Sequence, residues 1–242
     1  MHHGTPRAAA NREEPAVPRR LEGKAALVAL GEGGTGRAVA VAFAREGADI
    51  AIVYLNDHRD AEEIRQRVLL EGKRCILLSG DATKESFCRF AVRKALSALG
   101  RLDILVNDAG KQHPRPDQRD VSAPEIEHAF RANLLSMFNL TKAAAPRLAD
   151  GGAIINTTVT QADLPAGAPL TDYAEAMRSA TVAFTRSLAR ALRDRRIGVN
   201  AVDGPAHRNG GEIAPSYVSL AACDKTFVTE QVLPPAAGTS SR

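Results

Sequence analysis

The sequence has no tryptophan, few cysteines and few aromatic residues, and it contains no long apolar run. Of its 242 residues, 3 are cysteine, none is tryptophan, and aromatics make up 4%. No segment reaches the roughly 18 consecutive apolar residues that suggest a membrane-spanning helix. The first residues also lack the apolar stretch of a secretory signal. We therefore expect a cytoplasmic protein without a membrane span or a secretory leader.

Cysteine and histidine are too sparse and too scattered to indicate a disulfide framework or a metal site. The three cysteines, Cys75, Cys88 and Cys223, are odd in number and far apart along the chain. This spacing is typical of reduced thiols that pack as small apolar side chains. The 6 histidines show no metal-ligand spacing. The sequence therefore predicts no metal ion.

Half of the net charge lies in the first 20 residues. The chain carries a net charge of +4, and residues 1–20 contribute +2 of it through four arginines and two glutamates. No aromatic residue lies among these charges, so a solubilising or disordered arm is favoured over a nucleic-acid interface. We expect residues 21–242 to form one domain, because a chain that is 44% apolar can bury one substantial core.

Short apolar segments alternate with amphipathic segments along the rest of the chain. Strands are expected at residues 24–30, 49–54, 75–79, 102–107, 153–158, 198–202 and 232–233. Helices are expected at residues 37–47, 59–70, 85–99, 123–149, 170–193 and 212–222. Strict alternation with strands that are apolar on both faces predicts an α/β, Rossmann-like, doubly wound parallel sheet. The sheet should hold about seven strands between two helical layers.

A glycine-rich turn follows the first expected strand. It reads Gly31-Glu32-Gly33-Gly34-Thr35-Gly36 and leads into a helix and a second strand. In a strand-turn-helix unit of this kind, glycines allow the backbone to approach a dinucleotide diphosphate. Gly31, Gly33 and Gly36 satisfy the general dinucleotide fingerprint. The turn is therefore a candidate nucleotide-binding loop.

Further motifs resemble the short-chain dehydrogenase/reductase family from residue 21 to about residue 238. Asn107-Asp108-Ala109-Gly110 resembles the family's Asn-Asn-Ala-Gly, Asn133 matches its helix asparagine, and Tyr173 matches its catalytic tyrosine. The resemblance implies a Rossmann-like fold and a nicotinamide cofactor. It also implies cofactor contacts at Gly31, Gly33, Gly34, Gly36, Asp81 and Asn107.

The chain departs from the family pattern at the glycine loop and after the tyrosine. In one register of the loop, Leu30 takes the place of the first family glycine, where it is expected to crowd a cofactor. Met177 takes the place of the family lysine four residues after Tyr173. A methionine cannot stabilise a phenolate, and the neighbouring Arg178 lies about 100° further around the helix than residue 177.

Two more departures affect the substrate side of the site. The family serine is replaced within a threonine-rich segment, where Thr160 matches by spacing and Thr158 by its position at the strand end. Either hydroxyl can orient a substrate oxygen, and β-branched residues that simply finish a strand are an equal alternative. The segment 206–211 is much shorter than the family's substrate lid, so water is not excluded from the site.

Together these departures suggest a scaffold that has lost its redox activity. Our leading hypothesis is a protein without a functional cofactor that binds a small organic molecule for cyclisation or isomerisation. Tyr173, Asn133, Thr160 and Asp172 would supply the polar contacts. A silent subunit is the variant of this hypothesis, pairing with itself or with an active paralogue through the helices at 123–149 and 170–193.

The alternative hypothesis is an active ketoreductase that depends on NADPH. Tyr54-Leu55-Asn56 at the end of the second strand offers no acidic side chain for a ribose diol, and Arg37 can favour a 2′-phosphate. An exposed helix residue without a cofactor role is the simpler interpretation of Arg37. If a cofactor binds, we expect NADPH; nucleic acid and membrane are not expected as partners.

Overall fold

The computed structural model describes residues 19–31, 34–108, 122–159, 173–204, 210–222 and 227–234. Within these residues, strands and helices alternate as predicted. The strands are β1 (Ala25–Ala29), β2 (Asp49–Tyr54), β3 (Cys75–Ser79), β4 (Ile104–Asn107), β5 (Ala153–Val159), β6 (Gly198–Gly204) and β7 (Val232–Leu233). The α-helices are α1 (Thr35–Arg45), α2 (His58–Leu70), α3 (Glu85–Leu99), α4 (Ala123–Phe130), α5 (Ser136–Ala144), α6 (Tyr173–Ala191) and α7 (Gly210–Ala222).

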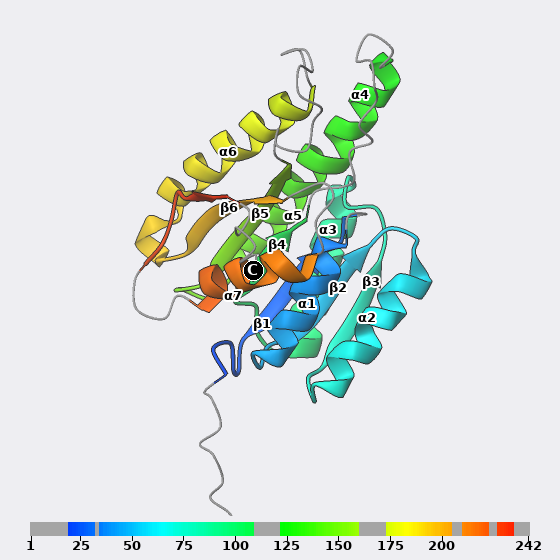
Figure 1. The fold of residues 1–242 in the computed structure, drawn as a ribbon, viewed down its shortest axis with the longest axis vertical. Coiled ribbons are helices and arrows are strands. Elements are labelled where there is room, and N and C mark those ends of the chain that lie inside the picture. Colours follow the sequence, from blue (N-terminus) through cyan, green and yellow to red (C-terminus); the bar gives the residue numbers. More distant parts are fainter. Residues whose placement is uncertain are drawn as a thin grey trace, which may run out of the picture.

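The strands form one parallel sheet of seven strands in the order β3-β2-β1-β4-β5-β6-β7. The order reverses between β1 and β4, which are direct neighbours although two strands separate them in the sequence. Figure 1 shows these strands side by side in the middle of the molecule, with helices on both faces. The predicted Rossmann-like fold is confirmed. A reversal of this kind leaves a crevice at the carboxyl ends of the strands.

Each face of the sheet packs against its own helical layer. Helices α1, α2 and α7 cover one face, and α3, α5 and α6 cover the other. In β1, Ala26 and Val28 face the first layer, whereas Ala25 and Leu27 face the second. This alternation follows from the two-residue period of a strand, and it explains why β1 has to be apolar on both faces.

The segment predicted as a single helix at residues 123–149 is not one regular helix. Helix α4 passes at Phe130 into a π turn, η2 (Arg131–Leu135), before α5 begins, and a 3-10 turn, η3 (Ala145–Arg147), ends the segment. Side chains bond to the backbone around the π turn, with Asn133 Nδ2 donating to the Ala129 carbonyl at 2.9 Å. Such turns occur frequently at functional sites.

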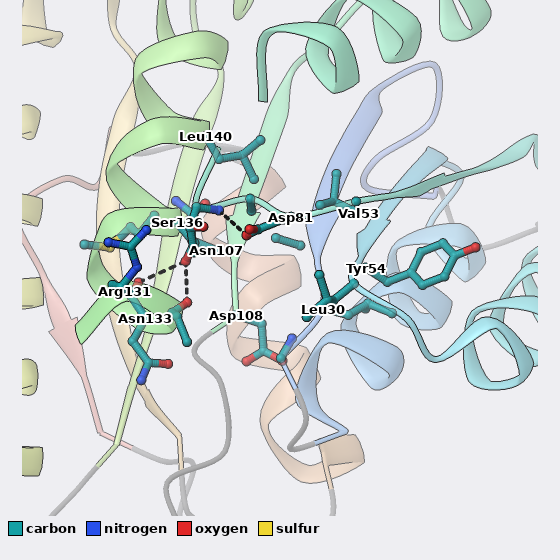
Figure 2. Close-up of a pocket in the computed structure, with 18 of the residues that line it drawn as sticks. Leu30, Val53, Tyr54, Asp81, Asn107, Asp108, Arg131, Asn133, Ser136 and Leu140 are labelled. Atoms are coloured by element: carbon teal, nitrogen blue, oxygen red, sulfur yellow. Dashed lines mark hydrogen bonds between the residues drawn. The ribbon is translucent and has the colours of Figure 1, made fainter. Parts of the chain in front are cut away.

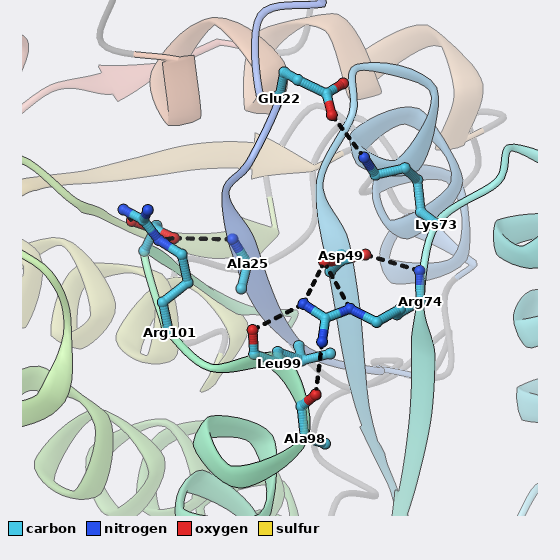
Figure 3. A network of polar contacts seen from close by, with 9 residues as sticks. Glu22, Ala25, Asp49, Lys73, Arg74, Ala98, Leu99 and Arg101 are labelled. Carbon is cyan, nitrogen blue, oxygen red and sulfur yellow. Dashed lines mark hydrogen bonds and ion pairs between the residues drawn. The ribbon is translucent and has the colours of Figure 1, made fainter.

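Polar side chains form hydrogen bonds and ion pairs at the amino ends of the strands (Figure 3). Asp103, directly before β4, accepts a hydrogen bond from the Ala25 amide at 2.9 Å and pairs with Arg101 at 2.6 Å. Asp49, at the start of β2, pairs with Arg74 at 2.8 Å. These contacts lie at the edge of the sheet opposite to the carboxyl ends, so they hold the strands in register without occupying the crevice.

The cysteines that the structure describes are free thiols. Burial raises the pKa of Cys75 to about 12 and that of Cys88 to about 11. Both therefore stay protonated at neutral pH and pack as apolar side chains. Cys223 and most of the predicted arm lie outside the described residues. Among the helices that the structure describes, none combines the length and the apolarity needed to cross a membrane.

Candidate functional site

A cavity of about 490 Å³ opens at the carboxyl ends of the strands, at the reversal between β1 and β4. Leu30 and Gly31 line it after β1, Tyr54 at the end of β2, and Asp81 after β3. The π turn η2 contributes Asn133 from the opposite side, as Figure 2 shows. This is where doubly wound sheets bind nucleotides.

The cavity brings together residues that the sequence places far apart. Of the candidates from sequence, four line it: Gly31, Asp81, Asn107 and Asn133. Gly34 and Gly36 lie at the beginning of α1. Gly33, Thr160 and Asp172 fall outside the described residues, and of Tyr173 the structure describes only its place as the first residue of α6.

The glycine turn has the backbone conformation that only glycine adopts easily. Gly34 precedes α1 with a φ of 79°, in the left-handed region. At Gly36 the constraint is space, because an added Cβ would lie 2.9 Å from Leu30 Cδ2 and 3.1 Å from Asp108 Oδ2. A side chain at position 36 would therefore collide with Leu30 and Asp108, both of which line the cavity.

Leu30, predicted to crowd a cofactor, leaves the cavity open. Its side chain packs partly against the apolar core between the sheet and α1, and its amide donates to the Val53 carbonyl at 2.8 Å. The remaining space of about 490 Å³ lies within the range of small-molecule and cofactor sites. The leucine therefore forms part of one wall of the cavity.

Asp81 presents a carboxylate to the cavity. Burial alone would raise its pKa, but hydrogen bonds from Thr83 and the charges of Lys84 and Arg131 hold the pKa of Asp81 below its usual value. The Thr83 amide donates to Asp81 Oδ1 at 2.8 Å. The side chain is consequently ionised at neutral pH and can accept hydrogen bonds from a ligand.

Two asparagines have buried side-chain oxygens that find no hydrogen-bond partner among the described residues. Asn107 Nδ2 donates to Thr141 Oγ1 at 3.1 Å and to Asn156 Oδ1 at 2.8 Å, which fixes the orientation of the amide. Asn107 Oδ1 and Asn133 Oδ1 are both buried, and within the part of the chain that the structure describes neither accepts a hydrogen bond. An unsatisfied buried acceptor costs about 1–3 kcal/mol.

Met177 contributes to an apolar cluster beside the cavity. It is 5% exposed and packs with Leu134 and Met137, of which Met137 also lines the cavity. The next residue, Arg178, pairs with Asp203 on β6 at 2.9 Å. Its guanidinium is therefore turned toward β6, which agrees with the prediction that Arg178 does not take over the position of a lysine at 177.

The structure describes one of the two threonines that were predicted to replace the family serine. Thr158 is buried, and its hydroxyl donates to Asp203 Oδ1 at 2.5 Å. That bond ties the end of β5 to β6, in line with the alternative that the residue finishes a strand. Thr160 lies outside the described residues, so its role stays a prediction.

Sequence reasoning missed Asp108, which lines the cavity at the end of β4. Its carboxylate accepts hydrogen bonds from the amides of Gly31 and Gly36, at 3.2 and 2.9 Å. Burial raises the pKa of Asp108 to about 6, even though these hydrogen bonds favour the ionised form. The signal was present in the sequence as the second residue of Asn-Asp-Ala-Gly, where the resembled motif has asparagine.

Comparison with known proteins gives related sequences over most of the chain. A family described as Enoyl-(Acyl carrier protein) reductase matches residues 29–210. General stress protein 39 of Bacillus subtilis is 50% identical over 88% of this chain and 83% of its own length. Uncharacterized oxidoreductase YhdF of the same organism is 41% identical over 88% and 82%. NADPH-dependent aldehyde reductase 1, chloroplastic, of Arabidopsis thaliana is 35% identical over 90% and 86%.

Solved structures resemble this fold with a cofactor bound. A blue fluorescent protein from a metagenomic library, in complex with NADPH, is 30% identical with a TM-score of 0.77 and is matched over 89% of this chain and 97% of its own. A short chain dehydrogenase from Burkholderia cenocepacia in complex with NADP is 28% identical with a TM-score of 0.74, over 89% and 97%.

These findings correct the hypothesis that redox activity is lost and that no cofactor is expected. Relatives over nearly the whole chain are named oxidoreductases or reductases, and similar structures hold NADPH or NADP. The hypothesis took departures such as Leu30 and Met177 together as a loss of the site, whereas Leu30 leaves the cavity open and Met177 packs beside it. The active reductase, kept as the alternative, agrees better with the relatives. The chain belongs to the short-chain dehydrogenase/reductase family.

Proposed function

We propose that the chain is an NADPH-dependent oxidoreductase that reduces a carbonyl compound to an alcohol. The observation that carries the proposal is the cavity at the reversal of the sheet. It is lined by the ionised carboxylate of Asp81 and by Asn107 and Asn133, whose buried amide oxygens have no partner among the described residues. Acceptors of this number suit a ligand rich in hydroxyl and amino donors, such as a dinucleotide. The names of the relatives and the cofactors of the similar structures support the same class of ligand.

The residues around the cavity divide into two groups in this proposal. Asp81 binds the adenine end through its carboxylate, and Asn107 and Asn133 accept from the hydroxyls nearer the nicotinamide. Gly34 and Gly36 allow the backbone at the start of α1 to approach the diphosphate, where the helix amides favour an anion. When bound, the nicotinamide supplies the hydride.

Tyr173 is the proton donor that we propose for the substrate oxygen. An unassisted phenol ionises near pH 10, so it is protonated and able to donate at neutral pH. The reverse reaction needs a phenolate, which is only about 0.1% of such a phenol at pH 7. With Met177 in place of an ammonium group, we therefore propose that reduction is favoured over alcohol oxidation at neutral pH.

The choice of NADPH over NADH rests on the end of β2. Tyr54 and Leu55 line the cavity there, and neither is the acidic residue that binds a ribose diol in NAD-specific sites. Arg37 does not support the choice, because its guanidinium pairs with Asp60 and with Glu63, the latter at 3.3 Å. A competition between the two cofactors tests this part of the proposal.

We further propose that the chain pairs with a second copy of itself through α4, α5 and α6. Phe130 on α4 and Phe138 on α5 are 53% and 45% exposed, which is unusual for large apolar side chains. Phe138 contacts Phe184 of α6, with ring centroids 4.1 Å apart and ring planes tilted by 43°, so an aromatic surface spans two helices. Light scattering after gel filtration should give a dimer or a larger species, and a monomer that persists at high concentration would contradict the pairing.

The experiment for the redox function is a titration with NADPH and NADH followed by an assay of carbonyl-dependent NADPH oxidation. We expect saturable binding, tighter for NADPH, and turnover with aldehydes or ketones. Asp81→Asn serves as the test of the site, because it keeps the shape of the side chain and removes the charge. If this variant binds NADPH as tightly as the wild type does, Asp81 does not contact the adenine.

A further inference from the structure

Asp108 is a buried carboxylate at the place where the glycine turn meets β4. Its Oδ2 accepts from the Gly31 amide at 3.2 Å and from the Gly36 amide at 2.9 Å. These two amides lie on either side of the turn, so one carboxylate fastens both of its ends. Figure 2 shows Asp108 between Leu30 and Asn133.

The environment behind Asp108 contains hydroxyls and no basic side chain among the residues described there. The Thr157 hydroxyl of β5 bonds to the carboxyl group, and Tyr217 of α7 lies 2.7 Å from Thr157 Oγ1. Both Thr157 and Tyr217 are buried. Burial and the negative charge of Asp108 raise the pKa of Tyr217, so the phenol stays neutral. Among the described residues, no neighbouring cation therefore neutralises the charge of an ionised Asp108.

A diphosphate bound at the glycine turn would bring negative charge close to this carboxylate. An ionised Asp108 repels such a ligand, whereas a protonated Asp108 does not. We propose that Asp108 couples dinucleotide binding to the uptake of a proton, so that affinity for the cofactor falls as the pH rises. This inference rests on the proposed function, since it concerns the diphosphate of the same cofactor.

The sign and the range follow from the environment of the carboxyl group. Its burial raises the pKa of Asp108 to about 6, within the range where cells vary their pH. Binding of an anion raises this pKa further, so the affinity is highest below pH ~6 and levels off about one unit higher. For one unit charge at a distance on the order of 10 Å and an effective dielectric constant near 20, the loss of affinity is roughly tenfold.

Other titratable and charged groups around the cavity have to be distinguished from Asp108. His128 and Arg131 line the cavity from the segment α4–η2, and Asp81 and Lys84 line it after β3. On α1, Arg37 follows Gly36, but its guanidinium is turned toward acidic residues of α2. His128 is the histidine among the described residues that line the cavity. A direct comparison of variants separates its effect from that of Asp108.

The test measures the dissociation constant of NADP+ by calorimetry between pH 5 and pH 8 for the wild type and Asp108→Asn. The amide keeps the size of the side chain and cannot ionise. The ratio of the wild-type constant to that of the variant cancels the titration of the 2′-phosphate and of every group that the two proteins share. We expect this ratio to grow from about 1 near pH 5 to roughly 10 near pH 8. The same growth should appear when both proteins carry His128→Gln.

A second measurement uses the wild type alone, in case the variant does not fold. Calorimetry with NAD+, which has no 2′-phosphate, in two buffers of different ionisation enthalpy should reveal uptake of about half a proton per bound NAD+ near pH 6.5. A ratio that stays constant with pH, or binding without proton uptake by the wild type, would overturn the inference and leave the proposed function intact. If neither protein binds NADP+ at any pH, both the inference and the proposed function are wrong.

Discussion

The stability of the Asp108→Asn variant should depend on pH in a way that can be worked out from the burial of this carboxyl group. In the unfolded chain the group has its ordinary pKa of 3.8, and in the folded protein burial raises it to about 6. Between these values the folded protein holds a proton that the unfolded chain has released. The contribution of Asp108 to the free energy of unfolding therefore falls as the pH rises from about 4 to about 6.

The magnitude follows from the separation of the two values. One pKa unit corresponds to about 1.36 kcal/mol, so a separation of about two units gives roughly 3 kcal/mol. Asparagine does not titrate, and its Oδ1 can still accept from the Gly36 amide. The free energy of unfolding of the variant minus that of the wild type should thus increase by roughly 3 kcal/mol from acid to neutral pH. About half of this increase should occur below pH ~5.

Urea unfolding at several pH values between about 4 and 8 measures this difference, because the titration of all other groups cancels between the two proteins. Asp49→Asn is the control with the opposite sign. Burial would raise the pKa of Asp49, but the hydrogen bonds and charge of Arg74 hold it below its usual value, so this group loses its contribution as the pH falls. A stability difference between Asp108→Asn and wild type that stays constant with pH would refute the account of Asp108.

Three further changes have expected outcomes. Asp103→Ala should lower the free energy of unfolding, measured in urea, by about 2–3 kcal/mol, because the change leaves the Ala25 amide without its acceptor. The control Asp150→Ala removes an exposed ion pair and should lower the free energy of unfolding by less than about 1 kcal/mol. Equal losses for the two variants would contradict this account. Met177→Lys should raise the rate of alcohol oxidation at neutral pH by about tenfold or more, and it should lower the melting temperature because Met177 lies in an apolar cluster. The control Met177→Leu should change the free energy of unfolding by less than about 1.5 kcal/mol and leave the rate of oxidation unchanged. Equal rates for the two variants would show that position 177 does not act on the phenol of Tyr173. Tyr173→Phe should lower the rate of carbonyl reduction by about a hundredfold or more with little change in NADPH affinity, measured by steady-state kinetics and calorimetry, and an unchanged rate would remove Tyr173 from the mechanism.

The fold could be predicted from the sequence because its signals are local. Residues 25–30 and 50–54 are apolar without interruption, and a glycine turn follows the first of them, so a parallel sheet buried on both faces was the simplest solution. The π turn η2 could not be predicted, because the apolar spacing continues through it. Side chain to backbone bonds, such as that of Asn133 to the Ala129 carbonyl, accompany this turn and become visible only in three dimensions.

The site was predicted in its location and misjudged in its activity. Parallel strands bring Asp81 and Asn107 to one edge of the sheet, and this follows from topology alone. The effect of Leu30 depends on how far its side chain turns into the core, which spacing does not reveal. Asp108 was overlooked because its importance depends on burial and on the amides of the glycine turn, both of which are tertiary properties.

The most direct test of the central claim is a calorimetric titration of the purified protein with NADPH, followed by an assay of NADPH oxidation with a panel of aldehydes and ketones. The account predicts saturable binding, weaker binding of NADH, and oxidation of NADPH that depends on the added carbonyl compound and is lost in Tyr173→Phe. Absence of binding under conditions where the protein is folded, or binding without turnover of any carbonyl compound, would contradict it.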